Sequence, residues 1–313
     1  MHFLENRDQG RPFFLNVSFH RPHAPLDPPK QYRAMYKDEP IPPVPVGDWA
    51  ARHDIPVDDP NAWHGRLSPE QLADARRSYY ALITHIDTQI GRFRQALEGM
   101  NIGPTWFLFT SDHGEMLGDH NLFRKTYAYE GSAGIPMIIT PPEVPGRRNS
   151  AAPVSQIDIM PTLLEAAGLN IPESVEGRSM LPLLDNSPAE AGWRDYVHGE
   201  HSPCYDKNTG MQFLTDGREK YIWYTLTGEE QLFDLAGDPD ELHNLADEPA
   251  CEDRLLLWRS RMVSELAGRA GDGLSDGNQL ISGIALSAVR DFLLEWGRQR
   301  NLPGLSGRPE ITH

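Results

Sequence analysis

One long amphipathic segment, residues 68–98, most strongly limits the folds open to this chain. It begins with an N-cap serine, Ser68, followed by Pro69 in the first turn and Gln71 at the position of a capping box. Apolar residues then recur on one helical face for about seven turns at 3.6 residues per turn, up to a break near Gly99. The residues of this face are Leu72, Ala75, Tyr79, Leu82, Ile83, Ile86, Ile90, Phe93 and Leu97. The sequence therefore predicts a long helix with one buried face.

Apolar segments typical of buried strands lie on both sides of this helix. Residues 12–19 and 105–110 are the two clearest, and residues 135–140 predict a third strand. Residues 157–167 predict a short helix that ends at Gly168. Because strands alternate with helices, the predicted fold class is α/β, with a mostly parallel sheet flanked by helices.

The pattern changes after about residue 190. Short strands separated by tight turns predict an antiparallel meander there. Two helices should follow it, over residues 251–267 and 285–296. We therefore expect a division into residues 1–190, an α/β part, and residues 191–313, a smaller α+β part with an antiparallel sheet. The four strands of the meander are predicted at 196–200, 211–215, 220–224 and 230–235.

Composition excludes some classes of partner. The net charge of −16 argues against nucleic acid, which basic surfaces bind. No apolar run approaches the roughly 20 residues that cross a bilayer, and the first residues show no secretory signal. The compartment stays open between the cytoplasm and the periplasm or exterior, and so does the oligomeric state. The two cysteines, Cys204 and Cys251, do not form a disulfide framework.

The densest group of chemically active side chains is SDHGEMLGDH, residues 111–120, directly after a predicted strand. Ligands of open α/β sheets bind outside the carboxyl ends of the strands. Asp112 offers a hard oxygen and His113 a nitrogen, and adjacent residues at a strand end can both face one cation. The alternative is that Asp112 caps a helix and His113 is an ordinary surface residue.

Two further residues have the chemistry of anion handling. His23 lies in a proline-locked turn after the first strand, where an imidazole can act as a general acid near neutral pH. Lys125 follows the 111–120 segment and could contact an anion at the same edge. Each also has a structural alternative, because a turn histidine can simply be structural and a lysine beside apolar residues can direct its charge to solvent.

Other polar side chains favour structural interpretations. The cluster at residues 198–201, HGEH, could contact a ligand, but a charged turn is the preferred interpretation. His85 and Asp87 lie among apolar positions of the long helix and are interpreted as hydrogen-bonding residues of the core.

Several motifs in a fixed order resemble one known family. Together with Lys125 they are VSFHRPHAP at 17–25, SDHGEMLGDH at 111–120, YEG at 129–131, DIMPTLL at 158–164, GRSMLPLL at 177–184, LFDL at 232–235 and DPDELHNL at 238–245. Across residues 12–250, this combination closely resembles the type I sulfatases of the alkaline phosphatase superfamily. The resemblance implies an alkaline-phosphatase-like fold. It also implies that residues 1–190 are the carboxy-terminal part of the catalytic domain.

The resemblance also implies a mechanism and its residues. In that family a divalent cation, most often Ca²⁺ with Mg²⁺ or Mn²⁺ as alternatives, polarises a sulfate ester of a small molecule or carbohydrate. Asp112 and His113 match one pair of metal ligands. His23 and Lys125 match residues that bind the sulfate group and help the leaving oxygen depart. The attacking group is a formylglycine hydrate made from Cys or Ser in a Cys/Ser-x-Pro/Ala-x-Arg motif.

The departures from the family pattern are as informative as the matches. Neither Cys204 nor Cys251 lies in the required motif, and the family's first metal-binding Asp pair has no counterpart, so we expect both in an upstream segment. His113 stands where many arylsulfatases have Asn, so the metal and the ester class stay open. Two alternatives therefore remain: a phosphonate monoester or phosphodiester hydrolase of the same superfamily, or a non-catalytic truncated remnant.

Overall fold

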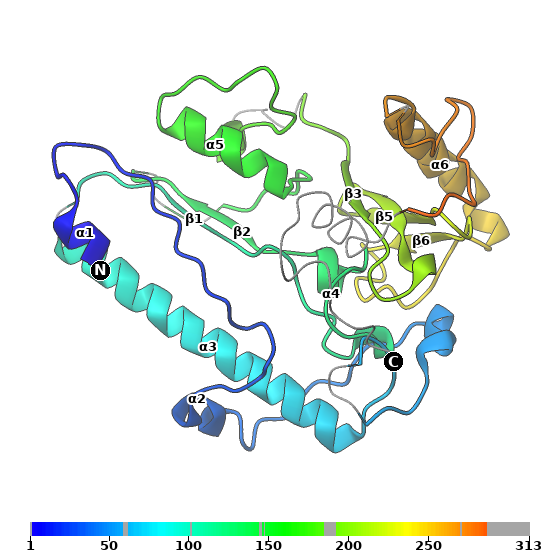
Figure 1. Ribbon diagram of the computed structural model, residues 1–313, viewed down its shortest axis with the longest axis horizontal. Coiled ribbons are helices and arrows are strands. Elements are labelled where there is room, and N and C mark those ends of the chain that lie inside the picture. Colours follow the sequence, from blue (N-terminus) through cyan, green and yellow to red (C-terminus); the bar gives the residue numbers. More distant parts are fainter. Residues whose placement is uncertain are drawn as a thin grey trace, which may run out of the picture.

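The computed structural model describes residues 2–58, 62–100, 102–143, 146, 148–184, 192–269 and 271–286. Helices and sheets are interspersed, so the chain is mixed α/β (Figure 1). Within the described ranges, no helix is long and apolar enough to cross a membrane. Besides the elements discussed below, the chain forms α1 (His2–Asn6), α2 (Lys30–Met35), α4 (Glu130–Ala133) and the 3-10 turns Asp48–His53, Asp119–Asn121, Gln156–Asp158, Leu181–Leu184, Lys207–Thr209 and Pro249–Cys251.

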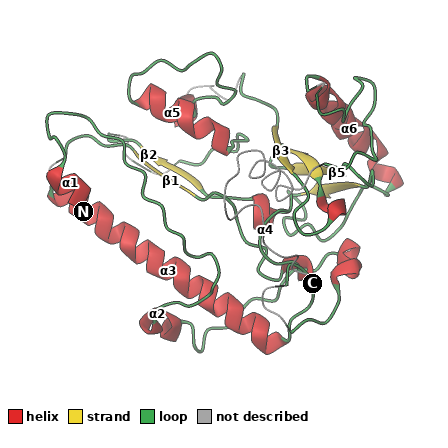
Figure 2. Cartoon of the chain, viewed as in Figure 1, coloured by secondary structure: helices red, strands yellow, loops and turns green. Residues whose placement is uncertain are grey.

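The predicted long helix is confirmed as α3 (Pro69–Gly99), which runs along one side of the molecule (Figure 2). Its capping box is formed: Gln71 N donates to Ser68 Oγ at 3.2 Å, and Ser68 N donates to the Gln71 side chain at 3.1 Å. Its buried face is shorter than predicted, because only Ser78, Ala81 and Leu82 are buried in it.

The pairing direction of the first sheet differs from the prediction. Strands β1 (Phe107–Thr110) and β2 (Met137–Thr140) pair antiparallel, with Phe107 opposite Thr140. Parallel strands need a crossover, usually a helix that packs back on the sheet. The segment between β1 and β2 contains only the 3-10 turn Asp119–Asn121 and the four-residue α4, and neither is long enough to form such a crossover helix. The short helix after it is confirmed as α5 (Ile159–Ala166), ended by Gly168 at φ +70°.

The predicted strand at residues 12–19 does not form within the described structure. The segment is extended but pairs with no described strand, and its Phe14 side chain is 74% exposed. Val17 and Phe19 are also exposed. An apolar, extended sequence becomes a strand only when another strand satisfies its backbone hydrogen bonds.

The carboxy-terminal meander is confirmed. Strands β3 (Val197–His201), β4 (Met211–Thr215), β5 (Glu219–Tyr224) and β6 (Glu230–Asp234) pair antiparallel in sequence order. Helix α6 (Glu252–Ala267) covers one face of this sheet (Figure 1). The helix predicted at 285–296 lies almost entirely outside the described residues. The division near residue 190 stays a prediction.

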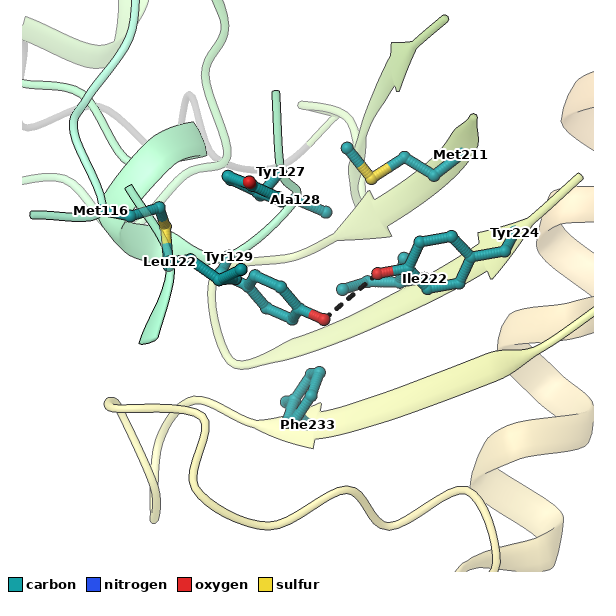
Figure 3. Packing of buried hydrophobic residues seen from close by; sticks show 9 residues of the cluster. All are labelled: Met116, Leu122, Tyr127, Ala128, Tyr129, Met211, Ile222, Tyr224 and Phe233. Carbon is teal, nitrogen blue, oxygen red and sulfur yellow. Dashed lines mark hydrogen bonds between the residues drawn. The ribbon is translucent and has the colours of Figure 1, made fainter. Parts of the chain in front are cut away.

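The other face of the carboxy-terminal sheet packs against the segment between β1 and β2. Figure 3 shows the buried side chains of this contact. Tyr129 lies at its centre, donating to Gln231 Oε1 at 2.9 Å and pairing with the Tyr224 hydroxyl at 3.1 Å. The cluster is Met116, Leu122, Tyr127, Ala128, Tyr129, Met211, Ile222, Tyr224 and Phe233. This core fixes the chain on both sides of Lys125.

Candidate active site

Asp112 and His113 follow β1 directly, as predicted. The Asp112 carboxylate is largely exposed, and one of its oxygens lies 3.5 Å from His113 Nε2. His113 Nδ1 lies 2.7 Å from the Gly114 carbonyl oxygen. That contact places a ring proton on Nδ1, because a carbonyl oxygen can only accept, so in the neutral imidazole Nε2 carries the lone pair.

His23 and Lys125 meet at the same place although 102 residues separate them in the chain. Lys125 Nζ donates to His23 Nε2 at 3.3 Å. His23 Nδ1 lies 2.9 Å from the Ala24 carbonyl, so Nδ1 carries the ring proton and Nε2 accepts from the ammonium. The rings of His23 and His113 stand edge to face with centroids 6.5 Å apart. The structure therefore brings the four sequence-predicted residues into one site.

Two residues that the sequence did not single out, Gln156 and Glu115, hold this site in shape. Gln156 Nε2 donates to the backbone carbonyls of Ser111 and Asp112, at 2.9 and 2.6 Å. The Glu115 carboxylate accepts from the backbone N–H of Leu117 and that of Arg124, the residue before Lys125. Gln156 has no periodic signal that could have revealed it. Glu115 lay within a recognised motif, but its role needs the folded loop.

Gly114 is required where two backbone segments touch. Gly114 N donates to Ser132 O at 2.8 Å, and an added Cβ would lie 2.2 Å from Gly131 O. The missing side chain of Gly114 therefore makes room for the first turn of α4. We expect Gly114→Ala to destabilise the fold by about 1–3 kcal/mol, because backbone cannot move aside as a side chain can. Gly91→Ala, in open space on α3, is the control and should not destabilise the fold. Equal urea unfolding midpoints for Gly114→Ala and Gly91→Ala would contradict the prediction.

A buried ion cluster ties α4 to the carboxy-terminal sheet. Lys220 Nζ, with a fully buried side chain, contacts Glu130 Oε1 at 2.6 Å and Glu241 Oε1 at 2.9 Å. The other Glu241 oxygen accepts from Glu130 N at 2.7 Å. Burial raises the pKa of Glu241, and Lys220 opposes that shift. This link anchors the chain five residues beyond Lys125.

His120 of the 111–120 motif is a structural residue. It is 2% exposed, accepts from Gly47 N at 3.1 Å and packs on Trp49 with ring centroids 4.7 Å apart. Burial lowers the pKa of His120 to about 4, against the opposing effect of Asp238. The same cause lowers the pKa of His53 to about 4.

These two histidines predict acid sensitivity. A folded-state pKa below the unfolded value means that the unfolded chain binds more protons, so stability is lost as the pH falls from about 6.5 towards 4. For His120, the loss should approach about 2–3 kcal/mol at the acidic end. His120→Asn can keep the left-handed backbone (φ +56°) and the hydrogen bond from Gly47. As the pH falls, its free energy of unfolding should decrease less steeply than that of the wild type. Urea unfolding at several pH values between 7.5 and 5 measures this, and the same pH dependence in both proteins would refute the prediction.

The remaining polar clusters are not part of the site. His198 lies in β3 and contacts Gln212 Oε1 at 2.7 Å, so the 198–201 segment is strand and not the expected turn. His85 is half-buried against Tyr32, and Asp87 is exposed, so interpreting both as core residues was wrong. The two cysteines are free.

The donor set fits part of a metal site. An exposed carboxylate beside a neutral imidazole whose Nε2 carries the lone pair is a suitable pair of ligands for a divalent cation. Among the described residues, no group of three or more His, Cys, Asp or Glu side chains converges on one point. Asp112 and His113 can therefore supply two ligands and not a complete set.

Comparisons with known proteins agree with this geometry. A model of the Sulfatase family matches residues 1–169, and one described as "N-sulphoglucosamine sulphohydrolase, C-terminal" matches residues 118–266. The chain is 44% identical over 295 residues to an arylsulfatase of Clostridium perfringens, covering 92% of this chain and 60% of that protein. It is 33% identical over 284 residues to the multifunctional alkaline phosphatase superfamily protein PehA of Trinickia caryophylli, covering 79% and 54%.

A solved structure shares the fold of this chain. The phosphonate monoester hydrolase of Agrobacterium radiobacter superposes with a TM-score of 0.72 at 28% identity, covering 85% of this chain and 58% of that one. This confirms the alkaline-phosphatase-like α/β fold. The chain spans little more than half the length of these relatives, up to 60%. By the family model, the overall identity and the shared fold, the chain belongs to the sulfatase family.

Proposed function

We propose that this chain supplies the leaving-group side and one metal-ligand pair of a sulfatase that hydrolyses sulfate monoesters. The observation that carries the proposal is the Lys125–His23 contact of 3.3 Å beside His113. Residues from three separate segments converge at the end of β1, where substrates of such sheets bind. Family membership supports the same reaction class.

Lys125 and His23 act on different parts of the anionic ester, the sulfate group and the leaving oxygen. The Lys125 ammonium attracts the negative sulfate group and donates to His23 Nε2. A proton passed along this contact can reach the departing oxygen. Proton donation matters most there, because an alkoxide is a poor leaving group and carries most of the developing charge.

Asp112 and His113 would hold a divalent cation, Ca²⁺ ahead of Mg²⁺ or Mn²⁺, which when bound supplies Lewis-acid polarisation of the sulfate oxygens. Both cysteines lie outside a Cys-x-Pro-x-Arg setting, and no Ser-x-Pro/Ala-x-Arg motif occurs in the 313 residues. We infer that the formylglycine nucleophile and the other metal ligands come from protein outside these residues. The substrate is a small-molecule or carbohydrate sulfate ester.

The alternative is hydrolysis of a phosphonate monoester or phosphodiester at the same residues. Its specific support is the 28% identity to a phosphonate monoester hydrolase over 85% of this chain.

The test is an assay of the protein translated from the complete reading frame. Para-nitrophenyl sulfate, bis-para-nitrophenyl phosphate and a phenylphosphonate ester would be compared by kcat/KM, with Asp112→Ala and chelator-treated enzyme as controls. The proposal expects sulfate turnover to be fastest, and to be lost in both controls and restored to the chelated enzyme by Ca²⁺. Faster turnover of either phosphorus ester would establish the alternative. No turnover of any ester would reject both.

A further inference from the structure

An open pocket of about 420 Å³ lies where α2 meets α3. In Figure 1, α2 stands beside the portion of α3 nearer its start. Four of the six lining residues are cationic and none is acidic, in a chain whose net charge is −16. The lining is Pro28, Lys30, Arg33, Ala34, Lys37 and Arg77. Such a concentration of one charge sign attracts anions.

Most of this positive charge is not neutralised within the described structure. Arg33 pairs with Asp74. No ion pair is formed by Lys30, Lys37 or Arg77 among the described residues, and both lysines are exposed. Arg77 donates one N–H to the Glu39 carbonyl at 3.2 Å, while its buried Nε has no hydrogen-bond partner there. The pocket therefore carries an excess of positive charge that the described structure does not balance, which favours a bound anion.

The pocket is close to the candidate active site along a braced loop. Pro28 lies five residues after His23, so their Cα atoms are at most roughly 17 Å apart. Arg21 braces the loop between them. It pairs with Asp27 at 2.5 Å and donates to the carbonyls of His23 and Pro25 at 2.9 and 2.8 Å. An extended ligand of a few sugar units held at His23 is long enough to span this distance.

We propose that this pocket binds a second sulfate group of a multiply sulfated oligosaccharide whose scissile ester lies at His23. The inference rests on the proposed function and extends it from an isolated sulfate ester to a sulfated chain. Lys30, Lys37 and Arg77 supply the charge, and the donors of Arg77 supply direction. The overall negative charge of the protein repels long polyanions elsewhere, which confines binding to this locally positive surface.

Direct binding measurements test the proposal without turnover. A heparin-derived octasaccharide and its chemically desulfated form would be titrated into the 313-residue chain by calorimetry at low salt. The double variant Lys30→Gln/Lys37→Gln and the single variant Arg77→Gln should each weaken binding of the sulfated form, by about tenfold for the double variant. Lys207→Gln/Arg218→Gln removes the same charge from exposed positions outside the pocket and should leave affinity unchanged.

Several outcomes would overturn the proposal. These are no binding of the sulfated octasaccharide, equal binding of the desulfated form, and equal weakening by the control pair. Equal affinity for single-stranded DNA of the same length would also overturn it, by showing a general polyanion surface. Unchanged circular dichroism and thermal midpoints would exclude unfolding of the variants. Because no chemistry is measured, this inference can fail while sulfate hydrolysis at His23 stands, and the reverse.

Discussion

Lys220→Met is expected to destabilise the protein by about 3–5 kcal/mol, because it leaves a buried carboxylate without its cation. Lys220 and Glu241 are both almost fully buried, and Glu241 also orients the first turn of α4 through Glu130 N. Without Lys220, Glu241 must be either buried as an anion or protonated. The loss should therefore be larger at pH 8 than at pH 5, where protonation of Glu241 relieves it. Urea unfolding at both pH values measures the effect.

Two further variants separate this mechanism from simple loss of packing. Glu241→Gln combined with Lys220→Met removes both charges and keeps an oxygen for Glu130 N, so it should be less destabilised than Lys220→Met alone. Arg66→Met breaks an exposed pair with Asp54 at 2.6 Å and should cost under about 1 kcal/mol. A loss for Lys220→Met that does not change with pH would contradict the uncompensated carboxylate.

His23→Asn in the complete enzyme is expected to lower kcat on sulfate esters by about 10²–10⁴-fold, because it removes proton delivery to the leaving oxygen. The reduction should grow as the leaving group becomes a weaker acid, from a nitrophenol to a sugar hydroxyl. Lys125→Met should show the same dependence and also raise KM, since it removes a charge that attracts the sulfate group. The measurement is kcat and KM over a series of sulfate esters of graded leaving-group pKa.

A matched control distinguishes proton delivery from general damage. His243→Asn changes an exposed histidine that pairs with Asp48 at 3.0 Å, far along the chain from the site. It should leave both kinetic constants unchanged. If the reduction in His23→Asn were the same for every leaving group, His23 would be a binding residue and not the proton donor.

Local sequence patterns predicted the structural features that depend on local interactions, namely the ends of helices and the order of the carboxy-terminal strands. The capping box at Ser68 fixed where α3 begins, Gly168 ended α5, and strand alternation with tight turns predicted the order of β3 to β6. These features depend on residues close in sequence, whose spacing carries the periodicity of a helix or strand. Motif order likewise identified His23, Asp112, His113 and Lys125, which the structure gathers.

Only the tertiary structure decided which distant residues meet. The sequence could not show that Lys125 Nζ contacts His23 across 102 positions, that Lys220 joins Glu241, or that β2 runs antiparallel to β1. It predicted a strand at residues 12–19, but a strand also needs a partner, and none lies within the described residues. The sequence alone does not distinguish His120 from a site residue, whereas its burial beside Trp49 identifies it as structural. Partner choice, burial and ion pairing arise from long-range packing, which composition and periodicity do not encode.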